Sequence, residues 1–507
     1  MFEPYASLFS KKLLLPIILI LLAGLVLRAH HITALPVFTD ETLHIERASH
    51  IYDFRQHPAE EGTGKFLFYF LPGIFDLTHG ETTLFLGRTI VALTSLITGA
   101  VVYRSGTMLF DVEAGFIGLV FYMLVPFAVF FERMALADPF AGLMAALLVW
   151  HSLRFARYPT NRRALWVGLF VALTPAAKLS MAFVGFVPVI TVVLFAEYES
   201  LSEMLHRYFP YGLRAAVIVI GLWSLVLVPA AIASYYTPGQ KYIFFPNFLV
   251  DTTTESQTFL QKLSDLWQKL DLLVWSPLVI VGILLLPKVM HSLPRRAGFI
   301  MVWLLLAWIP AFFIVGTNSF QSRYLMSGVP AIAVLVGAVF TVGLDFIAVL
   351  IRQMLVVLLF GFWIVLFALP FARDAAAEPE LLDLPPLDEK DYFAGYYNAY
   401  GLYEALDYLR ENGISQGQQV YVIQGTRFCL PDYYGFAAHM DMLCEKRFYR
   451  GDVDLKPLIN DDAVFYLITD APPLDLAVSG FHVNQVAVFN KPSGDIQITI
   501  WRLSVAD

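Results

Sequence analysis

Long apolar segments recur along the first three quarters of this chain and constrain its fold more than any other feature. A helix needs about 20 apolar residues to cross the roughly 30 Å hydrocarbon core of a bilayer. Of the 507 residues, 58% are hydrophobic and only 15% are charged, a smaller charged share than soluble domains carry. The sequence therefore predicts a mainly α, polytopic membrane protein with about eleven transmembrane helices, over residues 13–29, 84–104, 113–131, 138–156, 164–177, 179–196, 214–236, 272–287, 298–316, 324–344 and 354–372.

The segments at 164–177 and 179–196 are short and adjacent, with Pro175 and Lys178 near their junction. One continuous helix over both would be about 50 Å long at about 1.5 Å per residue, which exceeds the thickness of the bilayer. It would also move a basic loop further along the chain to the other side of the membrane. We therefore expect two helices with a turn at Pro175–Lys178.

Lysine and arginine gather in a few short loops, and short basic loops stay in the cytoplasm. With eleven spans, these loops fall on one side of the membrane. We therefore expect a cytoplasmic N-terminus and an extracytoplasmic C-terminal domain in a multi-pass protein of the cell membrane. The first apolar run could pass for a signal peptide, but no A-x-A-like site follows it, which favours a retained anchor. The basic groups are Lys11 and Lys12; Arg154, Arg157, Arg162 and Arg163; and Lys288, Arg295 and Arg296.

The composition of the chain changes after residue 372. The last part holds 21 acidic and 10 basic residues, a net charge of −11, which leaves +3 of the total −8 for the part before it. Such an acidic domain argues against nucleic acid as a partner. We expect a transmembrane domain over 1–372 with outer loops at 30–83 and 237–270, a linker at 373–397, and a small soluble α/β domain at 398–507.

Local patterns place further elements. A helix is predicted over Asn398–Asn412, with Gly413 as its C-terminal cap. The apolar run Phe66–Leu77 is too short to span a bilayer and is expected to lie at the outer interface. Strands are predicted in the C-terminal domain where Val, Ile and Tyr are frequent, over residues 419–424, 463–469, 485–489 and 496–502.

Charged residues occur at the outer ends of several predicted spans. Far apart in the sequence, they share one side of the membrane at similar depth in this topology. Charge close to hydrocarbon is costly, so such residues are candidates for function. Carboxylates can hold or deprotonate an acceptor hydroxyl, and Lys and Arg can neutralise a departing phosphate. The set suggests group transfer from a lipid phosphate, and comprises Asp40, Glu41, Lys65, Arg133, Asp138, Lys178 and Arg323.

Each of these residues also has a simpler interpretation. Asp40 and Glu41 could cap an interfacial helix, whose dipole favours acids in its first turn. Arg133 and Asp138 could form an ordinary turn pair, and the other Lys and Arg side chains could extend to lipid headgroups. The six histidines between residues 30 and 79 have no matched spacing, so no metal site is expected.

The chain has two cysteines, Cys429 and Cys444, both in the C-terminal domain. An extracytoplasmic domain lies in a compartment where disulfides form and persist. A bridge between the two residues and a pair of buried thiols are both compatible with the sequence. No metal-type Cys/His spacing accompanies them.

Five short motifs follow one another along the predicted outer side. In this order they resemble the membrane glycosyltransferases of the C superfamily, above all the branch of the protein O-mannosyltransferases and the lipid A aminoarabinose transferase. The likeness covers about residues 13–345. Two motifs match only in part: Phe66 and Leu67 replace the prolines of the family's Lys-Pro-Pro-Leu-Tyr-Tyr-Trp, and Lys178 alone remains of its Thr-Lys-Gly. The motifs are FTDE at 38–41, GKFLFYF at 64–70, ERMALAD at 132–138, AK at 177–178 and RYL at 323–325.

The resemblance implies a sugar donor linked to polyprenyl or dolichyl phosphate. It implies Asp40 as the catalytic acid/base beside Glu41, and Asp138 as a support for the acceptor or a metal. Lys65 would meet the donor phosphate. Arg133 would orient its loop and, with Lys178 and Arg323, is a further candidate for the phosphate.

Some chemical expectations accompany this resemblance. Inverting transfer needs one base and a stabilised leaving group, with no covalent enzyme intermediate. No cofactor is required, because a monophosphate leaving group carries less charge than a diphosphate, although a divalent metal remains compatible. A helix N-terminus lowers the pKa of a carboxylate, which weakens Asp40 as a base. The acceptor hydroxyl could belong to a protein, a lipid or a glycan.

Two other classes of function remain open from the sequence. A transporter or flippase for a lipid or lipid-linked sugar would also need many spans, but we find no inverted repeat and few charges at mid-depth. Flux in sealed vesicles without a glycosylated product would indicate it. A receptor with the C-terminal domain as its binding module would leave the outer loop at 30–83 without a role.

Overall fold

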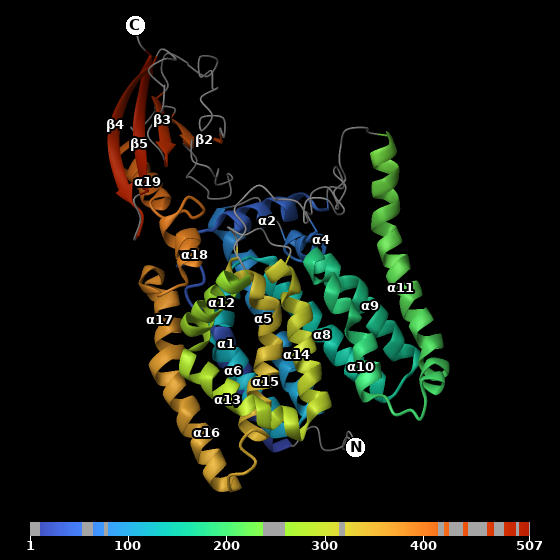
Figure 1. Ribbon diagram of the computed structural model, residues 1–507. Coiled ribbons are helices and arrows are strands. Elements are labelled where there is room, and N and C mark those ends of the chain that lie inside the picture. Colours follow the sequence, from blue (N-terminus) through green and yellow to red (C-terminus); the bar gives the residue numbers. More distant parts are fainter. Residues whose placement is uncertain are drawn as a thin grey trace.

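The computed structural model describes the chain over residues 11–52, 64–75, 80–236, 259–313, 320–413, 420–424, 440–444, 464–470, 481–492 and 496–505. Within these ranges the first three quarters form a bundle of helices, and a small β-sheet stands above one end of it (Figure 1). The C-terminus lies at the sheet and the N-terminus at the opposite end of the bundle. We call the end beneath the sheet the upper end, as Figure 1 shows it.

The bundle consists mostly of apolar helices, the longest of which run between its two ends. They begin and end as follows: α1 Lys11–Ala29, α5 Gly80–Leu109, α6 Val112–Leu124, α7 Pro126–Phe131, α8 Ala137–Arg157, α9 Asn161–Ala177, η3 Leu179–Phe186, α10 Val187–Phe195, α11 Leu201–Tyr236, α12 Phe259–Val274, α13 Ser276–Ser292, α14 Pro294–Phe313, η6 Ser322–Gly328, α15 Val329–Thr341, α16 Val349–Trp363, η7 Ile364–Ala368 and α17 Leu369–Ala377.

In the described part of the chain, six helices are long and apolar enough to cross a membrane. A seventh is added if α12 and α13, which are bent by 113° at their junction, form one span. Three shorter apolar helices, at Leu13–Ala29, Val112–Leu124 and Leu179–Phe195, accompany them. A multi-pass helical membrane protein is therefore confirmed, whereas the number of eleven spans is not.

One segment differs from the expected spans and loops. Helix α12 begins at Phe259, inside the outer loop expected at 237–270, of which residues 237–258 lie outside the described ranges. It is amphipathic and buries Lys262 and Lys269, so its mean hydropathy along the sequence is too low to indicate a transmembrane helix. By contrast, the break expected at Pro175–Lys178 is present, because α9 ends at Ala177 and Lys178 has an extended backbone.

Short helices cover the upper end of the bundle. Helix α2, Thr39–His50, lies across it, followed by α4, Phe66–Phe70, and the 3-10 turn η2, Pro72–Ile74 (Figure 1). The short helical run expected over Phe66–Leu77 is therefore present as α4 and η2. Helix α2 packs on α5, and α4 packs on α9, so polar side chains of this region lie over an apolar core.

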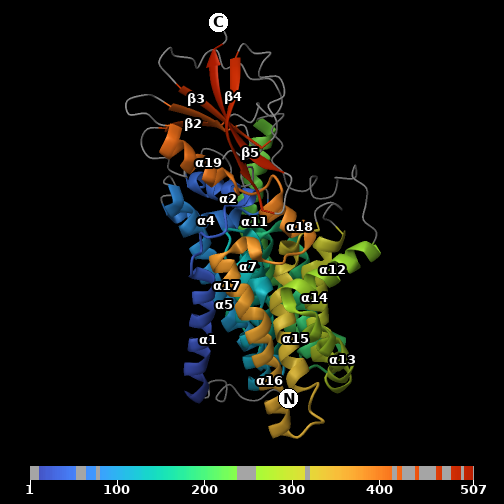
Figure 2. The ribbon, with the colours of Figure 1, turned by 90° about the vertical axis from the view of Figure 1, so that its left-hand side faces the viewer.

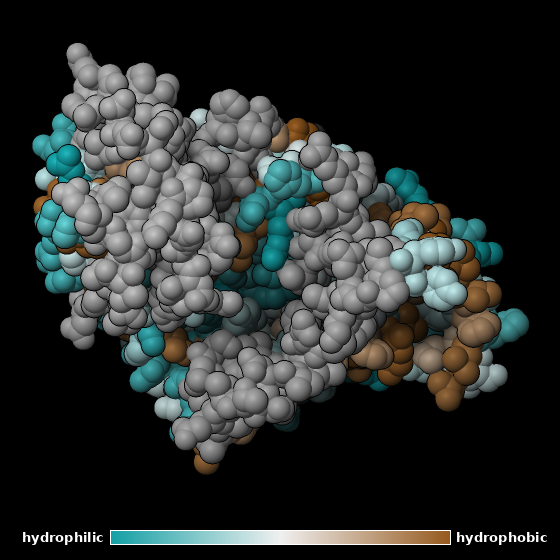
Figure 3. Space-filling model, turned by 90° about the horizontal axis from the view of Figure 1, so that it is seen from above, coloured by the Kyte–Doolittle hydropathy of each residue, from teal (hydrophilic) through white to brown (hydrophobic). Residues whose placement is uncertain are grey.

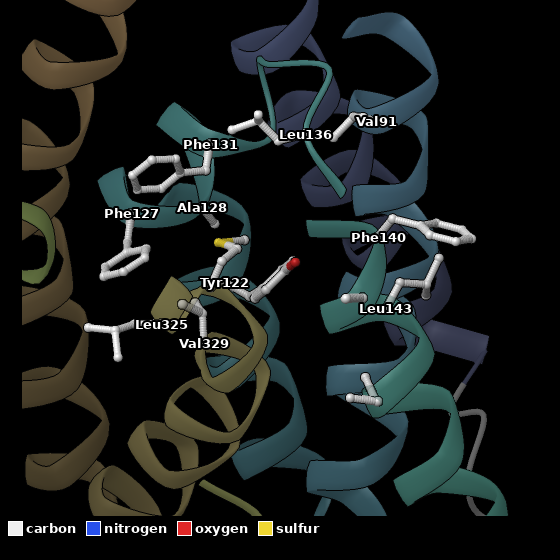
Figure 4. Close-up of a cluster of buried hydrophobic side chains, with 14 of the residues drawn as sticks. Val91, Tyr122, Phe127, Ala128, Phe131, Leu136, Phe140, Leu143, Leu325 and Val329 are labelled. Carbon is white, nitrogen blue, oxygen red and sulfur yellow. The ribbon is translucent and has the colours of Figure 1, made fainter. Parts of the chain in front are cut away.

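That core is dense and aromatic beneath the upper end. Figure 4 shows buried side chains of α6, α7 and α8 in this region, with Leu325 of η6 beside them. The rings of Phe127 and Phe131 lie 5.6 Å apart, and Phe140 lies 5.9 Å from Phe68. Small residues let the helices approach closely: a Cβ on Gly118 of α6 would lie 2.8 Å from a backbone oxygen of α15. This tightly packed core supports the upper end of the bundle, which holds the polar side chains.

The C-terminal domain is an α/β unit, as expected. Its sheet has the order β2-β1-β3-β5-β4, with β1 parallel to both neighbours and β5 antiparallel to β3 and β4. Helix α19, Leu402–Tyr408, and the π-helical turn η10, Leu409–Gly413, precede it. Four strands match the predicted ones, and β2 was missed: β1 Val420–Gln424, β2 Met440–Cys444, β3 Val464–Thr469, β4 Phe481–Asn490 and β5 Gln497–Val505.

The segment at 373–397, expected to be a linker, is packed between the bundle and the sheet. It contains the end of α17, the turn η8 at Pro379–Leu381, α18 at Pro386–Glu389 and the π-helical turn η9 at Lys390–Ala394. Figure 2 shows α18 between the bundle and the sheet. Its acidic composition suggested solvent exposure, but Asp388 and Asp391 are buried against partners of the bundle.

Candidate active site

The N-terminus of α2 places the first acidic motif at the upper end of the bundle. Phe38 precedes the helix with an extended backbone and pairs with Asn398 of the C-terminal region. The Thr39 N–H and hydroxyl both donate to the carbonyl oxygen of Tyr397, each at 2.9 Å. Asp40 follows in the first helical turn, where the helix dipole favours a negative charge.

Asp40 forms an ion pair with Arg323 from η6. The Nη1 of Arg323 donates to Oδ2 of Asp40 at 2.5 Å, although 283 residues separate the two in the sequence. The Asp40 side chain is 26% exposed and that of Arg323 is 7% exposed, so the carboxylate is the more solvent-accessible member of the pair. The guanidinium also lies 5.1 Å from the ring centroid of Phe38 and 5.0 Å from that of Tyr324.

A second buried ion pair joins Asp138, in the first turn of α8, to Lys178, directly after α9. The ammonium of Lys178 lies 4.6 Å from the ring centroid of Tyr324. Because the same ring contacts Arg323, Tyr324 lies between the two ion pairs. The turn at Lys178 thus brings a cation from the α9–α10 junction to the carboxylates.

Lys65 meets a histidine rather than a carboxylate. Its Nζ lies 3.2 Å from Nε2 of His44, whose Nδ1 lies 2.9 Å from the carbonyl oxygen of Ala135. The ammonium can only donate, so Nε2 accepts and Nδ1–H donates to the carbonyl, which defines a neutral imidazole. Burial lowers the pKa of His44 to about 3, and the charge of Lys65 acts in the same direction.

These side chains form one group, which we call the charge cluster: Asp40, His44, Lys65, Asp138, Lys178 and Arg323. It holds two carboxylates and three cations, with a neutral histidine, so one positive charge is left over. Burial would raise the pKa of Asp40, but the charges of Arg323 and Lys65 outweigh it and hold that pKa well below its usual range. Burial lowers the pKa of Lys65 to about 8.

The cluster is suited to an anion that approaches from the upper end. Seen from above, hydrophilic residues line a hollow in the middle of this face (Figure 3). Among the ion pairs of the described residues, Lys65 takes part in none, whereas Lys178 and Arg323 each hold a carboxylate. Lys65 is therefore the cation most available to a phosphate.

Two of the predicted site residues are directed elsewhere. The buried carboxylate of Glu41 accepts from Arg88 at 2.8 and 2.7 Å and from the Ala135 N–H at 2.7 Å. Arg133 donates to the carbonyl oxygens of Leu27 and His31, both at 2.8 Å, at the end of α1. These contacts hold α2, α5 and α1 together, and neither residue joins the charge cluster.

Sequence reasoning missed several polar residues of this region. His44 stands four residues after Asp40, a spacing that places both on one face of a helix and could have pointed to it. Tyr324 belongs to a quoted motif, but it was not assigned a role. Asp388 and Asp391 lie in the segment expected to be a linker; Asp388 accepts from the N–H of Ser322 at 3.1 Å and from its hydroxyl at 2.5 Å, and Asp391 accepts from Gln321.

The expectations about a metal and about a disulfide both stay predictions. Within the described ranges, no group of three or more His, Cys, Asp and Glu side chains is placed to hold a metal ion. The expected bridge between Cys429 and Cys444 falls outside the described residues, because Cys429 is not among them. It stays a prediction.

Solved structures with the same fold are known. The ArnT protein of Cupriavidus metallidurans bound to undecaprenyl phosphate matches over 97% of this chain and 98% of its own, with a TM-score of 0.56 and 13% identity. Its apo form matches equally well, at 14% identity. The apo oligosaccharyltransferase of Archaeoglobus fulgidus matches over 91% of this chain and 70% of its own, with a TM-score of 0.52 and 11% identity.

No protein-family model and no curated protein sequence matches the chain. For the fold, the resemblance stated from the motifs is confirmed by the structural neighbours, which share it beyond residues 13–345 over almost the whole chain. At identities of 11–14%, the likeness concerns the fold. The chain therefore has the same fold as ArnT and the archaeal oligosaccharyltransferase.

Proposed function

We propose that this chain transfers a sugar from a polyprenyl-phosphate-linked donor to an acceptor hydroxyl at the outer face of the membrane. One observation carries the proposal: a cation without a carboxylate partner, Lys65, lies beside the ionised carboxylate of Asp40 among the described residues. The fold shared with ArnT, whose structure holds undecaprenyl phosphate, supports a lipid-linked donor. The acceptor is a hydroxyl of a protein, a lipid or a glycan.

In this proposal the cations of the charge cluster bind the donor phosphate. Lys65 contacts it first, and Arg323 and Lys178 lie close enough to influence the same charge, since all three act on the carboxylates of the cluster. Neutralising the oxygen that leaves with its charge favours bond cleavage. Because the chain supplies these cations itself, the proposal requires no cofactor.

The reaction is an inverting displacement. The acceptor oxygen attacks the anomeric carbon from the side opposite to the phosphate. The bond from that carbon to the phosphate oxygen breaks, and its electron pair stays on the phosphate. Asp40 accepts a hydrogen bond from the acceptor hydroxyl and takes its proton as the new bond forms. Its low pKa makes it a weak base at rest, so proton transfer comes late, once Arg323 has turned toward the phosphate.

The test is the variant Asp40→Asn, assayed with a panel of polyprenyl-phosphate sugars. Transfer should fall by about 10²- to 10⁴-fold, as expected when a positioned acid/base is lost. Binding of undecaprenyl phosphate should persist, because the cations remain. Asp407→Asn, on the exposed face of α19, is the matched control and should transfer at the wild-type rate. Full activity of Asp40→Asn would refute the assignment.

Glu41→Gln separates this role from a structural one. Glu41 is completely buried in its pair with Arg88, and breaking a buried pair destabilises by about 3–5 kcal/mol. Its variant should lower the melting temperature by more than Asp40→Asn does, because the Asp40 side chain is 26% exposed whereas Glu41 is not exposed at all. Sealed vesicles that pass a lipid-linked sugar and form no glycosylated product would favour a transporter instead.

A further inference from the structure

A second polar site lies at the lower end of the bundle, in the turn between α8 and α9. A cavity of about 300 Å³ opens there, lined by His151, Arg154, Thr160, Arg162, Arg163 and Trp166. Helix α8 has 21 residues and is therefore about 31 Å long, so it separates this cavity from the charge cluster by roughly the thickness of a bilayer core. The cavity has no part in the proposed transfer.

The lining of the cavity is strongly positive. It contains three arginines and no carboxylate. Arg163 is held in place because it donates to the carbonyl oxygens of Arg154 at 2.9 Å and Tyr158 at 2.8 Å. The guanidinium of Arg154 lies 4.8 Å from the ring centroid of Trp150, and its Nε is buried with no hydrogen-bond partner in the described part of the chain. Arg162 is exposed at the rim.

The backbone of α9 adds donors to the same cavity. Thr160 is the N-cap of this 17-residue helix, and its hydroxyl accepts from the N–H of Arg163 at 3.4 Å. The first N–H groups of a helix have no acceptor within the helix, and the helix dipole favours an anion there. Three arginines and a helix N-terminus therefore meet at one cavity, which suits a phosphate.

One wall of the cavity is aromatic and continues into the apolar surface. The ring of His151 stacks on Trp166 at 5.4 Å and on Phe170 at 4.9 Å. Trp166 is 40% exposed, and the neighbouring Leu165 is 46% exposed. Exposed Trp and Tyr residues mark the interface between headgroups and hydrocarbon. A ligand with a phosphate and acyl chains can contact both parts, whereas a soluble phosphate reaches only the first.

We infer that this cavity binds the phosphate headgroup of an anionic phospholipid in the leaflet opposite to the charge cluster. The phosphate lies between Arg154 and Arg162 at the start of α9, and the acyl chains follow Leu165 and Trp166 along the helix. Basic pockets between transmembrane helices are a known mode of binding for anionic lipid headgroups. The bound lipid would fix the α8–α9 hairpin, whose other end carries Asp138 and Lys178.

The test uses the full chain in a neutral detergent and short-chain phosphatidylglycerol as the probe, with binding followed by native mass spectrometry. One lipid should bind saturably to the wild type. Arg154→Gln and Arg162→Gln should each weaken binding by about tenfold or more. Arg157→Gln is the matched control, because Arg157 belongs to the same loop, packs on Tyr158 at 5.3 Å and does not line the cavity. Its affinity should equal that of the wild type.

Three results would overturn the inference. Phosphatidylcholine of the same chain length binding as tightly would show that the headgroup charge is not recognised. Inorganic phosphate binding as tightly as the lipid, with Trp166→Ala unchanged, would assign the cavity to a soluble anion. Unaltered lipid binding by Arg162→Gln would remove the site altogether, and since Arg162 is exposed, this variant should keep the wild-type melting temperature.

Discussion

Lys65 is the residue whose charge state controls the proposed binding of the donor. Burial lowers its pKa from 10.5 to about 8, so the side chain is charged below pH 8 and neutral above it. We expect kcat/KM for the lipid-linked donor to fall as the pH rises from 7 to 9.5, because kcat/KM reports the groups of the free enzyme. In Lys65→Arg the charge persists, so this alkaline decline should disappear. A parallel decline in both proteins would contradict the role of Lys65.

The individual charged residues could be predicted, but their partners could not. Asp40, Lys65, Asp138, Lys178 and Arg323 stood out because charge is rare near the ends of apolar spans. Their pairing depends on tertiary packing: Arg323 meets Asp40 across 283 positions of the chain. The sequence also could not separate Asp40 from its neighbour Glu41, because one turn of helix directs the first toward the cluster and the second toward Arg88.

At the scale of elements, the segment between α17 and the sheet acts on both sides of the Asp40–Arg323 pair. Asp388 holds Ser322, the residue before Arg323, through two hydrogen bonds. The carbonyl oxygen of Tyr397 holds Thr39, the residue before Asp40. One short stretch of chain therefore fixes the backbone beside each partner. Composition predicted a linker here, because an acidic run that is buried by its partners cannot be recognised from residue types alone.

This arrangement makes Asp388 a positioning residue, and Asp388→Ala should lower kcat by about tenfold or more while changing the affinity for undecaprenyl phosphate little. A misplaced catalytic group impairs the chemical step more than ground-state binding. Asp388→Asn keeps an oxygen that can accept from Ser322 and should restore much of the rate. Asp383→Ala, at an exposed position of the same segment, is the matched control. Equal loss of donor binding and kcat in Asp388→Ala would indicate general unfolding of the site.

The elements that escaped prediction have a common physical cause. Strand β2 contains Met, Asp and Cys rather than β-branched residues, and it forms at the edge of the sheet by pairing with β1. Helix α12 buries Lys262, which donates to the carbonyl oxygen of Phe312, and therefore did not resemble an apolar helix. In both cases a partner from elsewhere in the fold stabilises the segment. The composition of β2 is not typical of a strand, and that of α12 is typical of a polar loop.

At the scale of the whole molecule, charged residues gather at both ends of the bundle. The charge cluster and the C-terminal domain lie at the upper end, whereas the basic α8–α9 turn lies at the lower end (Figure 1). Short basic loops face the cytoplasm, so we propose that the lower end is cytoplasmic and that the cluster and the acidic domain lie outside. A donor headgroup presented outside would then reach Lys65 without crossing the membrane.

Labelling of single cysteines in intact cells tests this orientation. In a chain with Cys429→Ser and Cys444→Ser, the variant Asp407→Cys on the exposed face of α19 should react with a membrane-impermeant maleimide added outside. Glu199→Cys, exposed between α10 and α11 near the lower end, should react only after the cells are permeabilised. The two positions control for each other, because both are exposed acids in the folded chain. The reverse pattern would place the charge cluster in the cytoplasm and exclude transfer at the outer face.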